Sequence, residues 1–213
     1  IQGNTRGFGG EEVVDILVNQ PACTRFIAGK LLRFISKPDP TKEQVEGLAQ
    51  VFRDNALDVK ATLGWLFRSE DFRARAHHRA LVKSPVEFSI GAVRAVGLDA
   101  MPANVDGANQ RMGQTLFNPP SVKGWTSGKG WLSSAAIVER LKAAQLVALA
   151  VNADLPAKLD DSVRDAKLAE LADRTIEVAL QGIVPDALAQ ALKATSGVER
   201  IAHILGSPEL QRA

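Results

Sequence analysis

Apolar residues recur along almost the whole chain at the spacing of an α-helix, and this periodicity limits the fold more than any other feature of the sequence. Val59, Leu63 and Leu66, for example, would share one face of a helix. The sequence contains no tyrosine and no sustained alternation of apolar and polar residues, so it gives little support to β-strands. We therefore expect an all-α fold, built as an irregular multi-helix domain.

Capping signals predict where several helices begin. Thr41 followed by Gln44 has the pattern of a capping box, in which each side chain accepts a hydrogen bond from the other residue's backbone N–H. Ser84, Pro85 and Glu87 combine the same box with a proline in the first turn. Further helices are expected from Asp58, from Ser134 to about Val151, and at about 163–181, 185–195 and 197–205.

The helix that follows Pro21 is rich in large apolar residues, and we expect it to bury them while its basic residues reach solvent. The side chains expected inside are Phe26, Ile27, Leu31, Phe34 and Ile35. The basic side chains expected at the surface are Arg25, Lys30 and Arg33.

The composition changes after residue 151. All eight Phe and all three Trp precede residue 132, and the later helices are rich in Ala and Leu. A polar connection at 152–161 separates the two parts. We therefore expect a main helical domain at 1–151 and a small C-terminal helical extension at 152–213 that packs on it.

Composition and charge exclude several classes of protein. With 213 residues, of which 46% are hydrophobic and 23% charged, the chain is long enough for one sizeable domain and is typical of a globular protein. A formal charge of +2 gives no reason to expect nucleic acid or an anionic membrane as a partner. The longest apolar run, 146–151, is too short to be a transmembrane segment. The single cysteine, Cys23, rules out an internal disulfide.

The stretch at 114–133 departs from the helical pattern and is the main candidate for a functional site. Its prolines, glycines and two tryptophans predict a long turn-rich loop, and such loops are more often functional than idle. Trp125 and Trp131 would offer a stacking platform for a sugar ring or another flat group. Alternatively, both indoles fill the gap between helices, with their N–H groups bonded to loop carbonyls. The candidate ligand-binding residues are Gln114, Asn118, Lys123, Trp125, Trp131 and Ser133.

The rest of the sequence carries no recognised catalytic motif. A phosphate-binding glycine loop, HExxH, GxSxG and CxxC are all absent, so we assign no catalytic residue, no metal ligand and no cofactor, and whether the chain is an enzyme stays open. The basic stretch at 73–83 lacks interleaved aromatic residues, which disfavours nucleic-acid binding. His77 and His78 are adjacent and would point to different helix faces, unlike a metal-binding i, i+4 pair. His203, among apolar neighbours, is expected to be structural.

Several segments share a pattern with one known family. The most specific is 113–125, which contains Pro119-Pro120 and ends in Gly124-Trp125, and the others are 9–17, 24–31, 66–72, 83–88, 131–134 and 207–211. On these segments the chain resembles a large bacterial family named domain of unknown function 1800. Leu210 stands where the family pattern would have Phe, which is a conservative difference.

The resemblance implies a helical fold, export from the cytoplasm to the periplasm or the cell exterior, and a neighbouring gene for a sulfatase-like protein. Members of the family are usually about twice as long. The likeness therefore implies that this chain is the C-terminal half and that the N-terminal half, which carries the export signal, is absent. The activity of the family is not established, so the resemblance transfers no catalytic residue.

Three functions stay open on the sequence alone. The first is a binding or scaffold module of an exported bacterial protein, which would dock another protein chain or the absent N-terminal half, or bind a carbohydrate-like ligand, through the loop at 114–133. The second is a hydrolase of carbohydrate-like or polymeric material, with a site shared with the absent half and with Asn118, Lys123 and Ser133 beside the indoles. The third is a purely structural helical shell.

Overall fold

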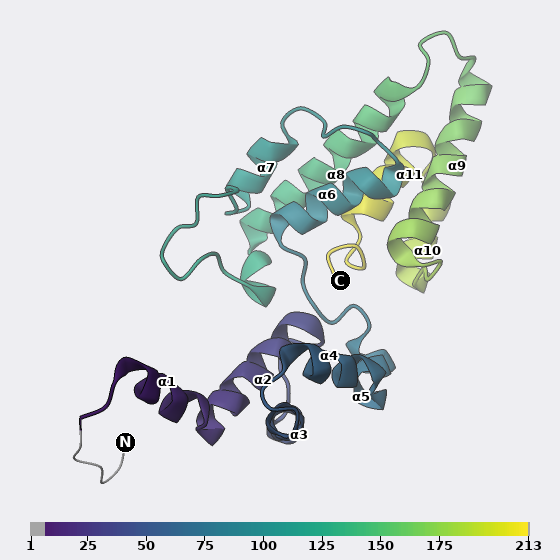
Figure 1. Cartoon of the computed structure of the whole chain (residues 1–213). Coiled ribbons are helices and arrows are strands. Elements are labelled where there is room, and N and C mark those ends of the chain that lie inside the picture. The colour runs from purple at the N-terminus through teal and green to yellow at the C-terminus, as the bar shows by residue number, and fades with distance from the viewer. Residues whose placement is uncertain (1–6, 213) are drawn as a thin grey trace. The chain divides into compact units, whose positions relative to one another are not determined.

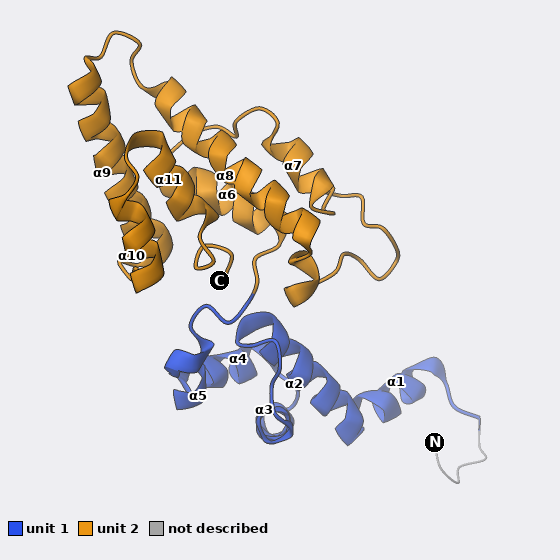
Figure 2. Cartoon of the chain, turned by 180° about the vertical axis from the view of Figure 1, so that it is seen from behind, with its two compact units in different colours: residues 1–81 blue, residues 82–213 orange. Residues whose placement is uncertain are grey.

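The computed structural model describes residues 7–212, and in this range every regular element is a helix (Figure 1). An isolated antiparallel bridge between Val82 and Arg212 belongs to no sheet. The expected all-α fold is therefore confirmed. Among the described helices, none combines the length and the apolar character that a membrane span requires. The chain forms two compact units, residues 1–81 and 82–213 (Figure 2).

Unit 1 consists of short helices around a small aliphatic core. Thr41 Oγ1 accepts a hydrogen bond from Gln44 N (3.3 Å), and Gln44 Oε1 accepts one from Thr41 N (2.9 Å), which confirms the predicted capping box. The core contains Ala28, Leu32, Leu48, Ala49 and Leu66. The helices are α1 (Gly10–Val18), α2 (Pro21–Ile35), α3 (Lys42–Asp54), α4 (Val59–Arg68) and α5 (Glu70–Arg73), followed by a 3-10 turn at Arg75–His77.

The face that α2 buries differs from the expected one. Phe26 is 61% exposed and Phe34 is 83% exposed, so the expectation that both are buried was wrong. Instead, Ala28 and Gly29 face α3, where the position of a Cβ on Gly29 would lie 3.8 Å from Val45 Cγ1. Small residues let the two helix backbones approach closely, and this contact turns the two phenylalanines outward. The three basic side chains of α2 are exposed, as expected.

Unit 2 begins at a second capping box. Ser84 Oγ accepts a hydrogen bond from Glu87 N (3.3 Å), Glu87 Oε2 accepts one from Ser84 N (2.7 Å), and Pro85 occupies the first turn, all as predicted. The helix ends at Gly97, whose φ of +80° favours glycine. The helices are α6 (Pro85–Val96), α7 (Val105–Arg111), α8 (Ser134–Asp154), α9 (Asp161–Leu180), α10 (Asp186–Lys193) and α11 (Gly197–Gly206), with a 3-10 turn at Gly128–Trp131 before α8.

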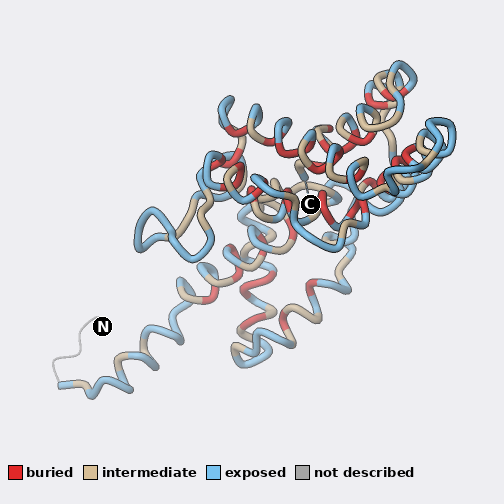
Figure 3. The backbone as a smooth tube through the Cα atoms, turned by 90° about the horizontal axis from the view of Figure 1, so that it is seen from above, coloured by how far each residue is buried: buried red, intermediate tan, exposed pale blue. Residues whose placement is uncertain are grey.

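One hydrophobic core spans unit 2 from its first helix to its last. α11 packs against α8 and α9, and α6 packs against the same two helices. Phe88 on α6, Val147 on α8 and Ile201 on α11 belong to one buried cluster. Figure 3 shows buried residues recurring along one side of the helices, as amphipathic packing requires. The division at 151 and 152 that the composition suggests falls inside unit 2, three residues before the end of α8.

A buried arginine ties the C-terminal turn to the start of α6. Arg140 on α8 is 1% exposed. It donates from Nη2 to the Lys83 carbonyl oxygen (2.7 Å) and from Nη1 to Gln211 Oε1 (3.0 Å), and its guanidinium lies 5.1 Å from the centre of the Phe88 ring. Burial lowers the pKa of Arg140 to about 10, and the Glu87 carboxylate partly opposes this effect.

Candidate functional site

The loop between α7 and α8 is anchored at both ends by two of the predicted site residues. Gln114 Oε1 accepts a hydrogen bond from Val86 N in the first turn of α6 (3.0 Å), and Gln114 N donates to the Asn109 carbonyl oxygen (2.9 Å). Ser133 Oγ accepts from Ala136 N (3.2 Å) and so caps α8. Both side chains therefore fix the base of the loop.

The two indoles of the loop differ in their environment. Trp131 is only 5% exposed, and its Cζ3 atom lies 3.9 Å from the position that a Cβ on Gly113 would occupy. Trp125 is half-buried, and its Nε1 has no hydrogen-bond partner among the described residues. Trp131 is thus packed inside, as the gap-filling interpretation expects, whereas Trp125 keeps part of its surface exposed.

The tip of the loop is apolar and faces solvent. Phe117 is 95% exposed, Val122 is fully exposed, and Leu116 is exposed as well. The predicted site residues Asn118 and Lys123 lie at the same tip and are also exposed. We call residues 116–123 the loop tip. The exposed Leu116, Phe117 and Val122 were not predicted as part of the site, although Leu116 and Phe117 lie outside the helical pattern and only Asn118 separates them from Pro119 and Pro120.

Phe117 also has an unusual backbone conformation. Its φ of +60° lies in the left-handed region, which bulky residues rarely adopt. Conformations of this kind cost about 1–3 kcal/mol and cluster at functional segments. The side chain receives no compensating burial, because it is almost wholly exposed. Strain and exposure together set Phe117 apart within the loop.

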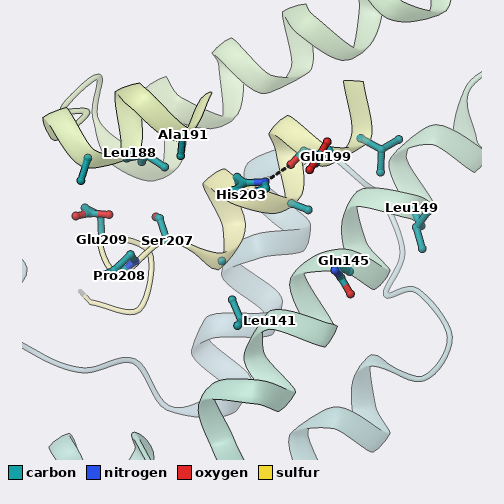
Figure 4. A pocket seen from close by; sticks show the side chains of 14 residues that line it. Leu141, Gln145, Leu149, Leu188, Ala191, Glu199, His203, Ser207, Pro208 and Glu209 are labelled. Atoms are coloured by element: carbon teal, nitrogen blue, oxygen red, sulfur yellow. Dashed lines mark hydrogen bonds between the residues drawn. The ribbon is translucent and has the colours of Figure 1, made fainter. Parts of the chain in front are cut away.

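An apolar groove of about 770 Å³ lies between α8, α10 and α11 and was not predicted (Figure 4). Leu141 and Leu149 of α8 line one side, Leu188 of α10 lines the other, and Ala202 of α11 lies between them. The polar groups in its lining include the side chains of Glu199, His203 and Glu209. Sequence periodicity could not reveal the groove, because three helices far apart in the chain form it.

His203 is exposed in this groove rather than enclosed among apolar neighbours. Its Nδ1 lies 2.9 Å from the Glu199 carbonyl oxygen, as the dashed line in Figure 4 shows. A carbonyl oxygen only accepts, so Nδ1 carries the proton and Nε2 is an acceptor in the neutral ring. The ring is thus bonded to the backbone, and its second nitrogen is an acceptor.

Unit 1 contains a serine, a histidine and an aspartate in one cluster. His77 Nδ1 lies 3.5 Å from Ser36 Oγ, and His77 Nε2 lies 3.9 Å from Asp71 Oδ1, which also accepts from Gln44 Nε2 (2.8 Å). Both histidine distances exceed the 2.6–3.2 Å or so that a nucleophile and its base need, and Ser36 is buried. The cluster links the C-terminal end of α2, the helices α3 and α5 and the 3-10 turn, and its serine is closed to solvent.

No three His, Cys, Asp or Glu side chains gather as metal ligands in the part of the chain that the structure describes. The loop at 114–133 contains no Asp or Glu of its own. General acid–base chemistry at this loop would therefore need a carboxylate from another segment. The loop and the groove instead provide apolar side chains and hydrogen-bonding groups, which are suited to binding.

These features define an all-α protein with an anchored, apolar-tipped loop and a separate three-helix groove. The chain belongs to the family described as "Protein of unknown function (DUF1800)", whose model matches residues 1–212. No curated protein and no solved structure shows detectable similarity to it. Family membership confirms the resemblance drawn from the sequence segments and adds no activity.

Proposed function

We propose that this chain is a binding module of an exported bacterial protein and that it docks another protein chain through the loop tip. The observation that carries the proposal is the exposure of Leu116, Phe117 and Val122 on a loop whose base is anchored by Gln114 and Ser133. Export is taken from the family resemblance. An apolar tip on a fixed base is the arrangement that favours recognition over a merely connecting role.

Anchoring lowers the entropic penalty of binding. A loop that is ordered before it meets its partner loses less conformational freedom on association. Burial of one phenylalanine side chain contributes about 1.5–3 kcal/mol, so Phe117 would serve as the central anchor. Asn118 and Lys123 at the same tip would supply the polar rim that surrounds such an anchor. Trp125, which is half-buried, would add an aromatic surface beside it.

Protein docking is favoured over the hydrolase and structural alternatives for two reasons. The loop carries no carboxylate, so hydrolysis would depend on acids from outside it. A purely structural shell would gain nothing from a strained and exposed Phe117. The side chains that would contact a carbohydrate in the alternative reading, Asn118 and Lys123, are equally suited to a protein rim.

Site-specific photo-crosslinking in the native cell tests the proposal. A benzophenone amino acid would replace Phe117 or Val122, and Val163, an exposed residue of α9, would serve as the matched control position. We expect one defined protein product from both loop positions and none of that size from position 163. Leu116→Asp should abolish the product and leave the melting temperature unchanged. Identical product patterns from all three positions, or none from the loop, would contradict the proposal.

A further inference from the structure

The groove between α8, α10 and α11 has the length of a short helix. Leu141, Gln145 and Leu149 recur at four-residue intervals along α8, and Val198, Ala202 and Gly206 do so along α11. Eight residues of helix rise about 12 Å, so each stripe spans roughly two helical turns. Figure 4 shows the α8 side chains and those of α10 on opposite sides of α11. The groove therefore runs along α11 with a wall on either side.

The size of the groove limits what kind of occupant it fits. The groove has a volume of about 770 Å³ and follows about two turns of α8 and of α11. An α-helix with its side chains is about 10–12 Å wide, so a groove of this length would cover one face of a two-turn helix.

Small side chains in the lining support the same occupant. Ala187 and Ala191 of α10 and Ala202 of α11 line the groove and leave room for a second backbone to approach. The opposite wall carries Leu141 and Leu149, which are exposed and would pack between the side chains of an incoming helix. Amphipathic helices bind in grooves of this kind with apolar residues at positions i, i+3, i+4 and i+7.

The polar groups of the lining set the charge of the occupant. Glu199 and Glu209 contribute carboxylates, and Glu209 Oε2 is buried without a hydrogen-bond partner among the described residues. His203 Nε2 is an acceptor in the neutral ring, because Nδ1 donates to the Glu199 carbonyl oxygen. No lysine or arginine belongs to the lining. Carboxylate oxygens accept their strongest hydrogen bonds from charged donors, which lysine and arginine side chains supply.

We propose that this groove binds a two-turn amphipathic helix of a partner protein whose apolar face is flanked by Lys or Arg. The site is separate from the loop tip and does not depend on the function proposed for it. The helix would lie along α11, with its apolar side chains between the leucines of α8 and α10. Its basic side chains would pair with the carboxylates of Glu199 and Glu209 in the lining.

A displayed library of helical peptides of about 14 residues, long enough for two turns and their caps, tests this proposal on the full chain. The library fixes Leu or Ala on one face and randomises the flanking positions. We expect enrichment of binders with Lys or Arg at the flanks. Ala202→Phe and Ala187→Phe, which fill the groove from two helices, should each weaken the selected peptides at least about tenfold. Ala169→Phe on the exposed side of α9 is the matched control.

Charge variants complete the test. Glu199→Gln and Glu209→Gln should each remove the preference for basic flanks and weaken the selected peptides about five- to tenfold, whereas Glu177→Gln on α9 should leave both unchanged. Failure to enrich any helix, equal enrichment of acidic flanks, or binding that survives both groove-filling variants would overturn the proposal. Saturation of the groove by decylammonium without any peptide enrichment would assign it to aliphatic amines instead and would also overturn it.

Discussion

Substitution of Arg140 by alanine removes a guanidinium that joins three parts of unit 2. Arg140 links α8 to the backbone at Lys83 and to the side chain of Gln211, and it lies against the ring of Phe88. Alanine would leave both half-buried acceptors without this donor, and it would remove the buried aliphatic stem of the side chain. We therefore expect the C-terminal turn to loosen and unit 2 to lose stability.

The size of the loss follows from opposing contributions. Hydrogen bonds from a charged donor stabilise by about 1.5–3 kcal/mol each, and two are lost. Removal of two buried methylene groups costs about 0.8 kcal/mol each. In the opposite direction, burial of the charge destabilises the wild type. The pKa of Arg140 is about 10, roughly two and a half below the ordinary arginine value, so removal of the buried charge restores about 3 kcal/mol of folding free energy. The expected net destabilisation by Arg140→Ala is about 3 kcal/mol.

Arg140→Met separates the hydrogen bonds from the packing. Methionine keeps most of the stem and has no charge, so we expect a smaller loss of about 1 kcal/mol. Denaturant unfolding should be followed by tryptophan fluorescence in a Trp65→Phe background, because the two remaining tryptophans, Trp125 and Trp131, both lie in unit 2. Arg111→Ala, which removes the exposed partner of the ion pair with Glu139, is the control and should cost less than about 1 kcal/mol.

A double-mutant cycle with Gln211→Ala measures the coupling directly. We expect a coupling free energy of about 1–2 kcal/mol between Arg140 and Gln211, because they share a hydrogen bond of 3.0 Å. The reasoning would be refuted by negligible coupling, or by an Arg140→Met variant that is more stable than the wild type by more than about 1 kcal/mol. Either result would mean that the hydrogen bonds do not offset the burial of the charge.

The difference in stability between the wild type and Arg140→Met should change with pH in a defined direction. Burial lowers the pKa of Arg140 in the folded chain to about 10, below its value in the unfolded chain. Above about pH 10 the unfolded chain therefore holds a proton that the folded chain has released, and stability rises with pH in this window. The wild type should gain stability relative to Arg140→Met as the pH rises through 10, while the titration of shared lysines cancels in the difference.

Three further outcomes follow from local geometry. Phe117→Ala should leave the free energy of unfolding within about 0.5 kcal/mol of the wild type and weaken docking at least about tenfold, measured as loss of the crosslinked product. Gly91→Ala, inside α6 with nothing within 4 Å of the new Cβ, should raise the melting temperature, because alanine loses less backbone entropy than glycine in a helix. Hydrogen bonds from Lys142 and Arg111 lower the pKa of Glu139. The stability that the ionised carboxylate contributes should therefore be lost as the pH falls through that lowered pKa. The measurement is the free energy of unfolding of the wild type, which should converge with that of Glu139→Gln at low pH.

Local chemistry made part of the fold predictable from the sequence. The capping boxes at Thr41 and Ser84 depend on residues within one turn, so both helix starts are where the sequence places them. The buried face of α2 was not predictable in the same way. Where apolar residues lie on several sides of a helix, contact with the partner helix determines which of them are buried. In α2 the small Ala28 and Gly29 are buried, whereas Phe26 is exposed.

The candidate sites depend on contacts between distant segments, which sequence periodicity does not record. The loop was recognisable from its composition, but the outward position of Phe117 and the inward position of Trp131 are set by packing in unit 2. The links that Arg140 makes join residues 57 and 71 positions apart. The groove likewise combines α8 with two helices that begin more than thirty residues after α8 ends. Only a three-dimensional arrangement brings these groups together.

The loop tip and the groove should bind independently, although α8 connects them. Ser133 at the base of the loop caps α8, and Leu141 of the groove lies eight residues further along the same helix, a rise of about 12 Å. Coupling between two sites requires an element with two discrete arrangements that both ligands bias. A continuous helix in a packed core has one arrangement, so binding at one surface should not change the affinity of the other. We expect Phe117→Ala to leave the affinity of groove-selected peptides unchanged, and Ala202→Phe to leave the loop crosslink unchanged, with additive effects in the double variant. A change of more than about threefold at one surface on substitution at the other would show instead that α8 moves as a two-state element and that a partner must engage both surfaces together.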